Sequence, residues 1–135
     1  MKLRSLTILI LLAGLALPVV GHHTSYFDPE KIVTLTGKVA RFEWKNPHAF
    51  LVIDVETPDG QVERWTVEGR SPNQITRAGW TRQTFKLGTV VTVVGRPPRD
   101  SSRLTESGSN FLGAGPVQFA DGQTLVFGPI DTSDQ

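Results

Sequence analysis

Alternation of apolar and polar residues predicts a chain rich in β-strands that begins with one long, bent strand. In segment 31–44 the apolar residues Val33, Leu35 and Val39 fall on odd positions, and Phe42 and Trp44 fall on even positions. Successive side chains of a strand point to opposite faces, so this change of parity near Ala40 indicates a bulge inside the strand. Gly37 in its interior indicates the tight coiling that bends a strand around a small barrel.

Later apolar and β-branched runs predict further strands, some of them paired as hairpins. The Pro-Asp-Gly turn at 58–60 and the Asp-Gly turn at 121–122 each separate two such runs, as hairpin connections do. Two prolines at 97–98 end another run, because proline cannot donate to a sheet ladder. The strands predicted after the first one cover residues 50–55, 62–67, 90–94, 117–119 and 125–127.

One short helix and one polar loop complete the predicted order of elements. Ser71 can cap a helix, Pro72 suits its first position, and Gln74 can complete a capping box. Gly79 is expected to end this helix. Segment 99–110 is mostly Ser, Arg, Gly and other polar residues, which bury too little apolar surface to order a chain, so we predict a mobile loop there.

This order predicts a mainly β fold, namely a small OB-like (oligonucleotide/oligosaccharide-binding) Greek-key barrel of five to six strands with one short helix. An immunoglobulin-like sandwich would have about seven strands and no helix at this point. A parallel sheet would need helical crossovers, which the sequence lacks.

The start of the chain has the pattern of a cleavable signal peptide. Lys2 and Arg4 precede an apolar stretch at 6–16, and small residues lead to Gly21. The stretch is shorter than the roughly 20 apolar residues that a membrane-spanning helix needs. We therefore expect residues 1–21 to be removed, which leaves residues 22–135 as one domain outside the cytoplasm, without membrane attachment.

Charge and cysteine content exclude several classes of function. Loss of Lys2 and Arg4 reduces the 14 basic residues to 12, against 13 acidic ones, so no basic excess favours nucleic acid. The chain has no cysteine, which excludes thiolate metal sites and thiol redox chemistry.

The three histidines of the chain are His22, His23 and His48, and two of them stand at the predicted mature terminus. The α-amine and imidazole of His22 would form a chelating pair, and His48 could add a third nitrogen, with His23 as a weaker variant. A nitrogen-rich site without sulfur favours Cu(II). The alternatives are a solvated terminal pair and a His48 ring that packs on Trp44 or bonds to a backbone carbonyl.

A second candidate is an aromatic ligand-binding surface, since barrels of this kind bind ligands by stacking on exposed strand faces. Trp44, Phe50, Trp65 and Trp80 could form it, and Asn46 would add a polar contact. The alternative is that these rings only pack in or around the core.

Catalysis has less support from the residues. Acidic residues alternate along the predicted strands, which is typical of a solvated sheet face rather than of an acid/base pair. They are Asp54, Glu56, Glu63 and Glu68. The sequence has no nucleophile elbow, phosphate loop or zinc-protease helix.

Several motifs are spread over almost all of the expected mature chain. They are His22-His23-Thr24-Ser25, Phe27-Asp28, Gly37-Lys38-Val39, 42–48, 65–68, 77–80 and Val90-Thr92-Val94-Gly95. These motifs resemble a family of short secreted bacterial proteins of unknown function. The resemblance implies a periplasmic or secreted protein of a Gram-negative bacterium with an OB-like barrel, a mature terminus with two histidines and a Trp-x-Asn-Pro-His turn, here at 44–48, but it implies no activity. Thr24 stands where that family tends to have Ser.

The sequence thus favours an exported binding module, rather than an enzyme, with copper as the candidate cofactor. Two alternatives stay open. One is a metal-free module that binds a small molecule, a glycan or a periplasmic protein on its aromatic face, and the other is a copper-dependent oxidase or oxygenase.

Overall fold

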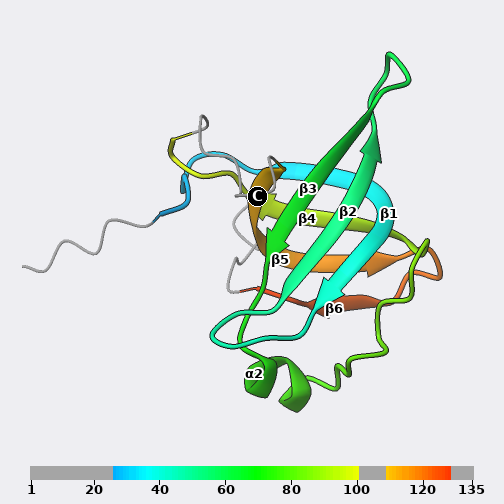
Figure 1. Ribbon diagram of the computed structural model, residues 1–135. Helices are drawn as coiled ribbons and strands as arrows, with labels where there is room; N and C mark the ends of the chain where they lie inside the picture. Colours follow the sequence, from blue (N-terminus) through cyan, green and yellow to red (C-terminus); the bar gives the residue numbers. More distant parts are fainter. Residues whose placement is uncertain (1–25, 101–108, 129–135) are drawn as a thin grey trace, which may run out of the picture.

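The computed structural model describes residues 26–100 and 109–128 (Figure 1). Within these ranges the chain is mainly β, with one short helix between the third and fourth strands. The elements are β1 (Val33–Glu43), β2 (Phe50–Glu56), β3 (Val62–Glu68), α2 (Pro72–Arg77), β4 (Val90–Arg96), β5 (Asn110–Phe119) and β6 (Thr124–Val126).

Five strands close into a barrel, and the sixth extends its wall. The strand order is β3-β2-β1-β4-β5-β6, and a parallel pairing between β3 and β5 joins the two ends of the five-stranded part. The short strand β6 pairs only with β5 among the described strands. This closed barrel, with its helix between β3 and β4, confirms the predicted OB-like fold class (Figure 1).

The long first strand bends where its sequence predicted a bend. Its first half pairs with β4 and its second half with β2, and the register with β2 shifts between Val39 and Arg41. Gly37 is needed close to this bend, because a Cβ there would lie 2.6 Å from the carbonyl oxygen of Asp54. The bulge and the glycine together allow one strand to serve two neighbours.

Helix α2 closes one end of the barrel and also follows its predicted signals. The Gln74 Oε1 atom accepts hydrogen bonds from the Ser71 backbone N–H at 3.2 Å and from the Ser71 hydroxyl at 3.1 Å. Ile75 is fully buried in the core, and Gly79 follows the helix with φ of +89°. Pro72 of the helix is buried as well, so the helix is held by its cap and by two buried side chains.

The start of β5 was predicted wrongly. Residues 101–108 of the predicted loop at 99–110 lie outside the described residues. The strand β5 begins at Asn110, well before its predicted start at Val117. This part of β5 contains Gly113, Ala114 and a further glycine, so it carries neither alternation nor β-branched residues. Small residues are nevertheless required there, because a Cβ on Gly113 would lie 2.7 Å from the Phe27 ring.

Candidate ligand pocket around His48

The backbone after β3 fixes the loop that carries His48. Ala49 donates its N–H to the Arg70 carbonyl at 3.0 Å and accepts a bond from the Gly69 N–H at 2.8 Å. These bonds extend the β2–β3 pairing by one step beyond the strands and place His48 next to Glu68. The His48 Nδ1 atom pairs with Glu68 Oε1, while 48% of the His48 side chain stays exposed.

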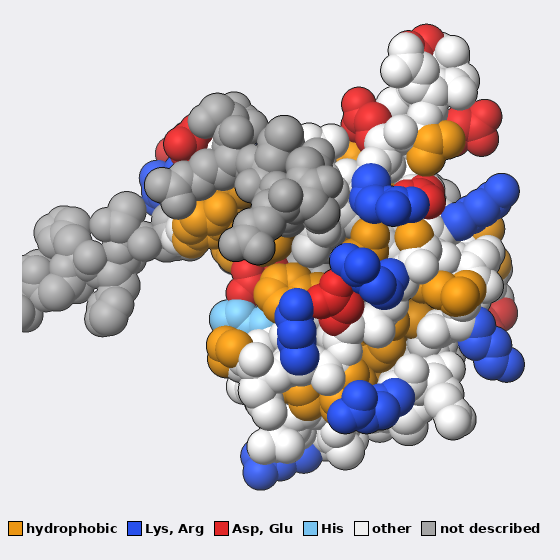
Figure 2. All heavy atoms as spheres, viewed as in Figure 1, with side chains coloured by type: hydrophobic (Ala, Val, Ile, Leu, Met, Phe, Trp, Pro, Cys, Tyr) orange, Lys and Arg blue, Asp and Glu red, His pale blue; other side chains and the backbone are white. Residues whose placement is uncertain are grey.

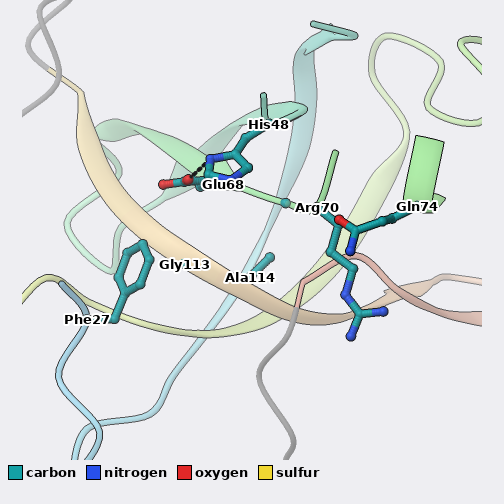
Figure 3. Close-up of a pocket in the computed structure, with 8 residues that line it drawn as sticks. Phe27, His48, Glu68, Arg70, Gln74, Gly113 and Ala114 are labelled. Atoms are coloured by element: carbon teal, nitrogen blue, oxygen red, sulfur yellow. Dashed lines mark ion pairs between the residues drawn. The ribbon is translucent and has the colours of Figure 1, made fainter. Parts of the chain in front are cut away.

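A pocket of about 480 Å³ lies beside this pair (Figure 3). The His48–Glu68 pair forms one side, Arg70 and Gln74 form another, and Phe27 stands across from Arg70. Its volume is within the range of about 300–1,000 Å³ that is common for small-ligand pockets. The residues that line it are Phe27, His48, Glu68, Gly69, Arg70, Gln74, Gly113 and Ala114.

Phe27 is brought to the pocket by the segment before β1. Its backbone forms an isolated bridge with Pro98, and the Asp28 N–H donates to the Pro97 carbonyl at 2.9 Å. The Phe27 ring then lies against Gly113 of β5 and stacks on Phe111, with ring centroids 5.9 Å apart. The first described residues of the chain are thus tied to the wall of this pocket.

Glu68 determines which nitrogen of His48 is available. A carboxylate that holds one ring nitrogen fixes the orientation of an imidazole, and the same pairing is found behind many metal-bound histidines. Because Glu68 holds Nδ1, Nε2 is the nitrogen left for a ligand or a proton. The prediction that Glu68 belongs to a merely solvated sheet face is wrong, because its carboxylate lines the pocket and bonds to His48.

Not all of the four aromatic residues predicted as a surface are exposed. Trp80 is only 1% exposed and belongs to the core, which confirms for this residue the alternative that the ring packs in the core. Its burial follows from α2, which turns the chain back over the end of the barrel. Trp44 and Trp65 are partly buried against the core cluster.

The other predicted contacts lie in different surroundings. Trp44 faces the Arg82 guanidinium at 5.7 Å, and the Trp65 Nε1–H donates to Glu63 at 3.2 Å. Asn46 is exposed in the loop before His48 and does not line the pocket. Phe50 pairs with Glu68 across the sheet and so points to the outer face, where its ring lies 6.5 Å from that of Phe111. A ligand-binding role for these side chains stays a prediction.

The outer face carries an aromatic cluster that the sequence analysis missed, which we call the outer cluster. It is continuous with the pocket through Phe27. A signal existed in the adjacent aromatic pair at 26–27, but Phe111 lies at the end of a polar segment and gave none. The outer cluster consists of Tyr26, Phe27, Phe50 and Phe111, whose neighbouring centroids are 5.1 to 6.5 Å apart.

Charges near the barrel surface are mostly paired. The Lys45 ammonium and the Arg41 guanidinium lower the pKa of Glu43, and Arg64 hydrogen bonds lower the pKa of Asp54. On the face shown in Figure 2, basic side chains are interspersed with acidic and apolar ones. Paired carboxylates of this kind stay ionised and serve as structural contacts.

The described part of the chain does not by itself contain a metal centre. In residues 26–100 and 109–128, no group of three or more His, Asp or Glu side chains could hold a metal ion. His22 and His23 lie outside the described residues, so the predicted copper ligands can be compared with the structure only at His48. In these same ranges no helix is long and apolar enough to cross a membrane.

Comparison with known protein families identifies the family of the chain. The Family of unknown function (DUF6152) matches residues 10–107. The chain belongs to this family. No curated protein matches it. The function of DUF6152 is unknown, which agrees with the absence of any activity motif in the sequence. The pocket is therefore the feature from which a function can be inferred.

Proposed function

We propose that this DUF6152 protein is an exported binding module that takes up Cu(II) at the His48 pocket. The ligands would be Nε2 of His48 and the amine and imidazole nitrogens of His22, once residues 1–21 have been removed. The observation that carries the proposal is the His48–Glu68 pair, which occupies Nδ1 and leaves Nε2 available.

The length of the chain start is compatible with this site. Phe27 lines the same pocket as His48, and His22 stands five positions before it. Five extended residues span at most about 17 Å, which exceeds the width of a pocket of this volume. The terminal amine and ring could therefore reach His48 without any movement of the barrel.

Three nitrogen ligands without sulfur suit copper better than other divalent metals. Copper has the highest affinity in the divalent series for such donors, and tetragonal nitrogen sites are typical of Cu(II). His23 offers a further imidazole next to the terminal pair.

A titration of the mature protein tests the proposal. Protein expressed with its own signal is first checked for a His22 terminus by mass analysis, and Cu(II) affinity is then measured with a competing chelator. His48→Ala should weaken Cu(II) binding at least tenfold, whereas Lys45→Ala, which shortens an exposed side chain of the same loop, should not change it. Equal affinity in wild type and His48→Ala would remove His48 from the site, and a terminus other than His22 would remove the chelating pair.

Glu68 gives a second, independent measurement. Glu68→Gln keeps the size of the side chain but removes the charge that holds Nδ1, so Cu(II) affinity should fall about tenfold, as for other partners of metal-bound histidines. Glu43→Gln, which changes a carboxylate paired with Lys45, is the matched control. If Glu43→Gln weakened binding equally, the effect would be one of net charge.

The outer cluster favours a second candidate, a metal-free module for a small molecule, a glycan or a protein. Tyr26 is 46% exposed, and its ring meets those of Phe27 and Phe111 edge to face. Such rings provide stacking surfaces for ligands. In this case binding would persist in the presence of a chelator and would be lost in Phe111→Ala.

A further inference from the structure

The side of the pocket opposite the His48–Glu68 pair offers hydrogen-bond donors. Arg70 has its backbone fixed on both sides, because its N–H donates to the Phe127 carbonyl at 2.8 Å and its carbonyl accepts from Ala49. Its side chain forms no ion pair with any described residue. Lys31, Arg41, Lys45 and Arg64, by contrast, each form an ion pair with an acidic side chain.

Gln74 adds a second donor on the same side. Its Oε1 atom accepts from the backbone and hydroxyl of Ser71, so the orientation of the side-chain amide is set by the helix cap. The amide nitrogen is then the atom that can donate to a ligand. Figure 3 shows Gln74 next to Arg70, away from Glu68.

The remaining wall of the pocket is apolar. Gly113 and Ala114 of β5 run between the two polar sides but are buried, and the half-buried Phe27 ring stands at the far end (Figure 3). The Phe27 ring lies where a Cβ on Gly113 would be, so Phe27 covers this glycine and is the apolar surface that the wall offers to a ligand. A planar aromatic ring can stack on it, whereas a bulky aliphatic group would not use it fully.

The charged side chains determine how an anionic ligand would be oriented in the pocket. The Glu68 carboxylate repels an anion, but it bonds to His48 on one side of the pocket. Arg70 lies on another side, so the anionic end of a ligand would point toward Arg70 (Figure 3). We propose that the Arg70 end of this pocket binds the carboxylate of a planar aromatic acid, whose ring packs against Phe27. The inference rests on the pocket being a ligand site, as in the proposed function, but it does not require copper.

Naphthalene-2-carboxylate is a suitable probe, and naphthalene-2-carboxamide is its neutral match. Metal-free protein is titrated with each compound in the presence of a chelator, and binding is followed by the NMR signals of the backbone N–H groups. Naphthalene-2-carboxylate should shift the signals of Arg70, Gly113 and Ala114. The amide should bind at least tenfold more weakly, because it is neutral and has a single acceptor oxygen, so it cannot form a bidentate ion pair with Arg70. Both compounds should give the same relative affinities after Cu(II) binding has been weakened by His22 substitution.

Two variants at one position separate charge from folding. Arg70→Gln should lose at least tenfold in affinity for the acid and little for the amide, and Arg70→Lys should recover part of the loss. Arg41→Gln is the control, because Arg41 is exposed on β1 and paired with Glu43. Equal binding of acid and amide, an unchanged affinity in Arg70→Gln, or NMR shifts confined to another face would each overturn the inference while leaving the copper titration unaffected.

Discussion

Two aromatic clusters lie on opposite sides of the same barrel wall, and they differ in what they leave accessible. The inner cluster is formed by Trp80, Phe85 and Phe127, which are at most 5% exposed and whose centroids lie 5.0 to 6.0 Å apart. The outer cluster keeps exposed ring surface next to the pocket. Rings of the first kind stabilise the fold, whereas rings of the second kind remain free to contact a ligand.

Each cluster has one phenylalanine ring that lies against a glycine. Phe127 covers Gly69 on the inside, and Phe27 covers Gly113 on the outside; a Cβ on these glycines would lie 2.5 Å and 2.7 Å from the ring, respectively. The similar local geometry means that the surroundings of the ring, rather than the contact itself, should decide the effect of a substitution. This pair of sites allows the comparison to be tested directly.

Removal of the inner ring should have the largest effect on stability. Phe127→Ala would leave a cavity among fully buried side chains and should lower the free energy of unfolding by about 3–5 kcal/mol. Phe27→Ala, on the half-buried outer side, should cost about 1 kcal/mol. Urea unfolding followed by tryptophan fluorescence measures both, and similar losses in the two variants would contradict the division into a structural and an accessible cluster.

Adding a methyl group at the two glycines should have the next largest effect. Gly69→Ala forces the Phe127 ring into a close-packed core and should cost about 1–3 kcal/mol. At Gly113 the Phe27 ring can move toward solvent, so Gly113→Ala should be less destabilising. It should instead alter the pocket and weaken binding of the aromatic acid. An unfolding free energy reduced more by Gly113→Ala than by Gly69→Ala would contradict this expectation.

The strands around the inner cluster and helix α2 could be inferred from the sequence because they follow local patterns. Parity in β1, turn residues between β2 and β3, and the cap of α2 all act over a few residues. The early part of β5 could not be inferred from such patterns, because its small residues are required by contacts with Phe27 and Gly95, which are distant in sequence.

The pocket was only half predictable for the same reason. His48 was singled out by its rarity, but its partner Glu68 depends on the backbone bonds between Ala49 and the end of β3. The contact of Phe27 with Gly113, which completes the wall, depends on the bridge of Phe27 with Pro98. Alternation along a strand says which face a residue occupies, but not which residue of another strand lies beside it.

A polar pair on the outer surface of the same sheet should have the smallest effect. Asp54 and Arg64 face each other across β2 and β3, with Arg64 Nε at 2.7 Å and Nη2 at 2.9 Å from the carboxylate oxygens. The Arg64 hydrogen bonds lower the pKa of Asp54 in the folded state. Stability from a carboxylate with a lowered pKa is present above its unfolded pKa of about 3.9 and is lost as the pH falls through the folded value.

Arg64→Gln should therefore reduce the free energy of unfolding at pH 7 by less than any of the substitutions above, because the Arg64 side chain is 59% exposed and solvent screens the pair. The difference from wild type should shrink below about pH 4 and vanish once Asp54 is protonated in both states. Unfolding curves at pH 7, 4 and 2.5 measure it, with Lys86→Gln as an exposed control whose difference should not follow the titration of Asp54. A difference that persisted at the lowest pH would show that Arg64 stabilises the hairpin by packing of its aliphatic part. Side-chain packing would then contribute to stability on the outer face of the sheet as it does in the core.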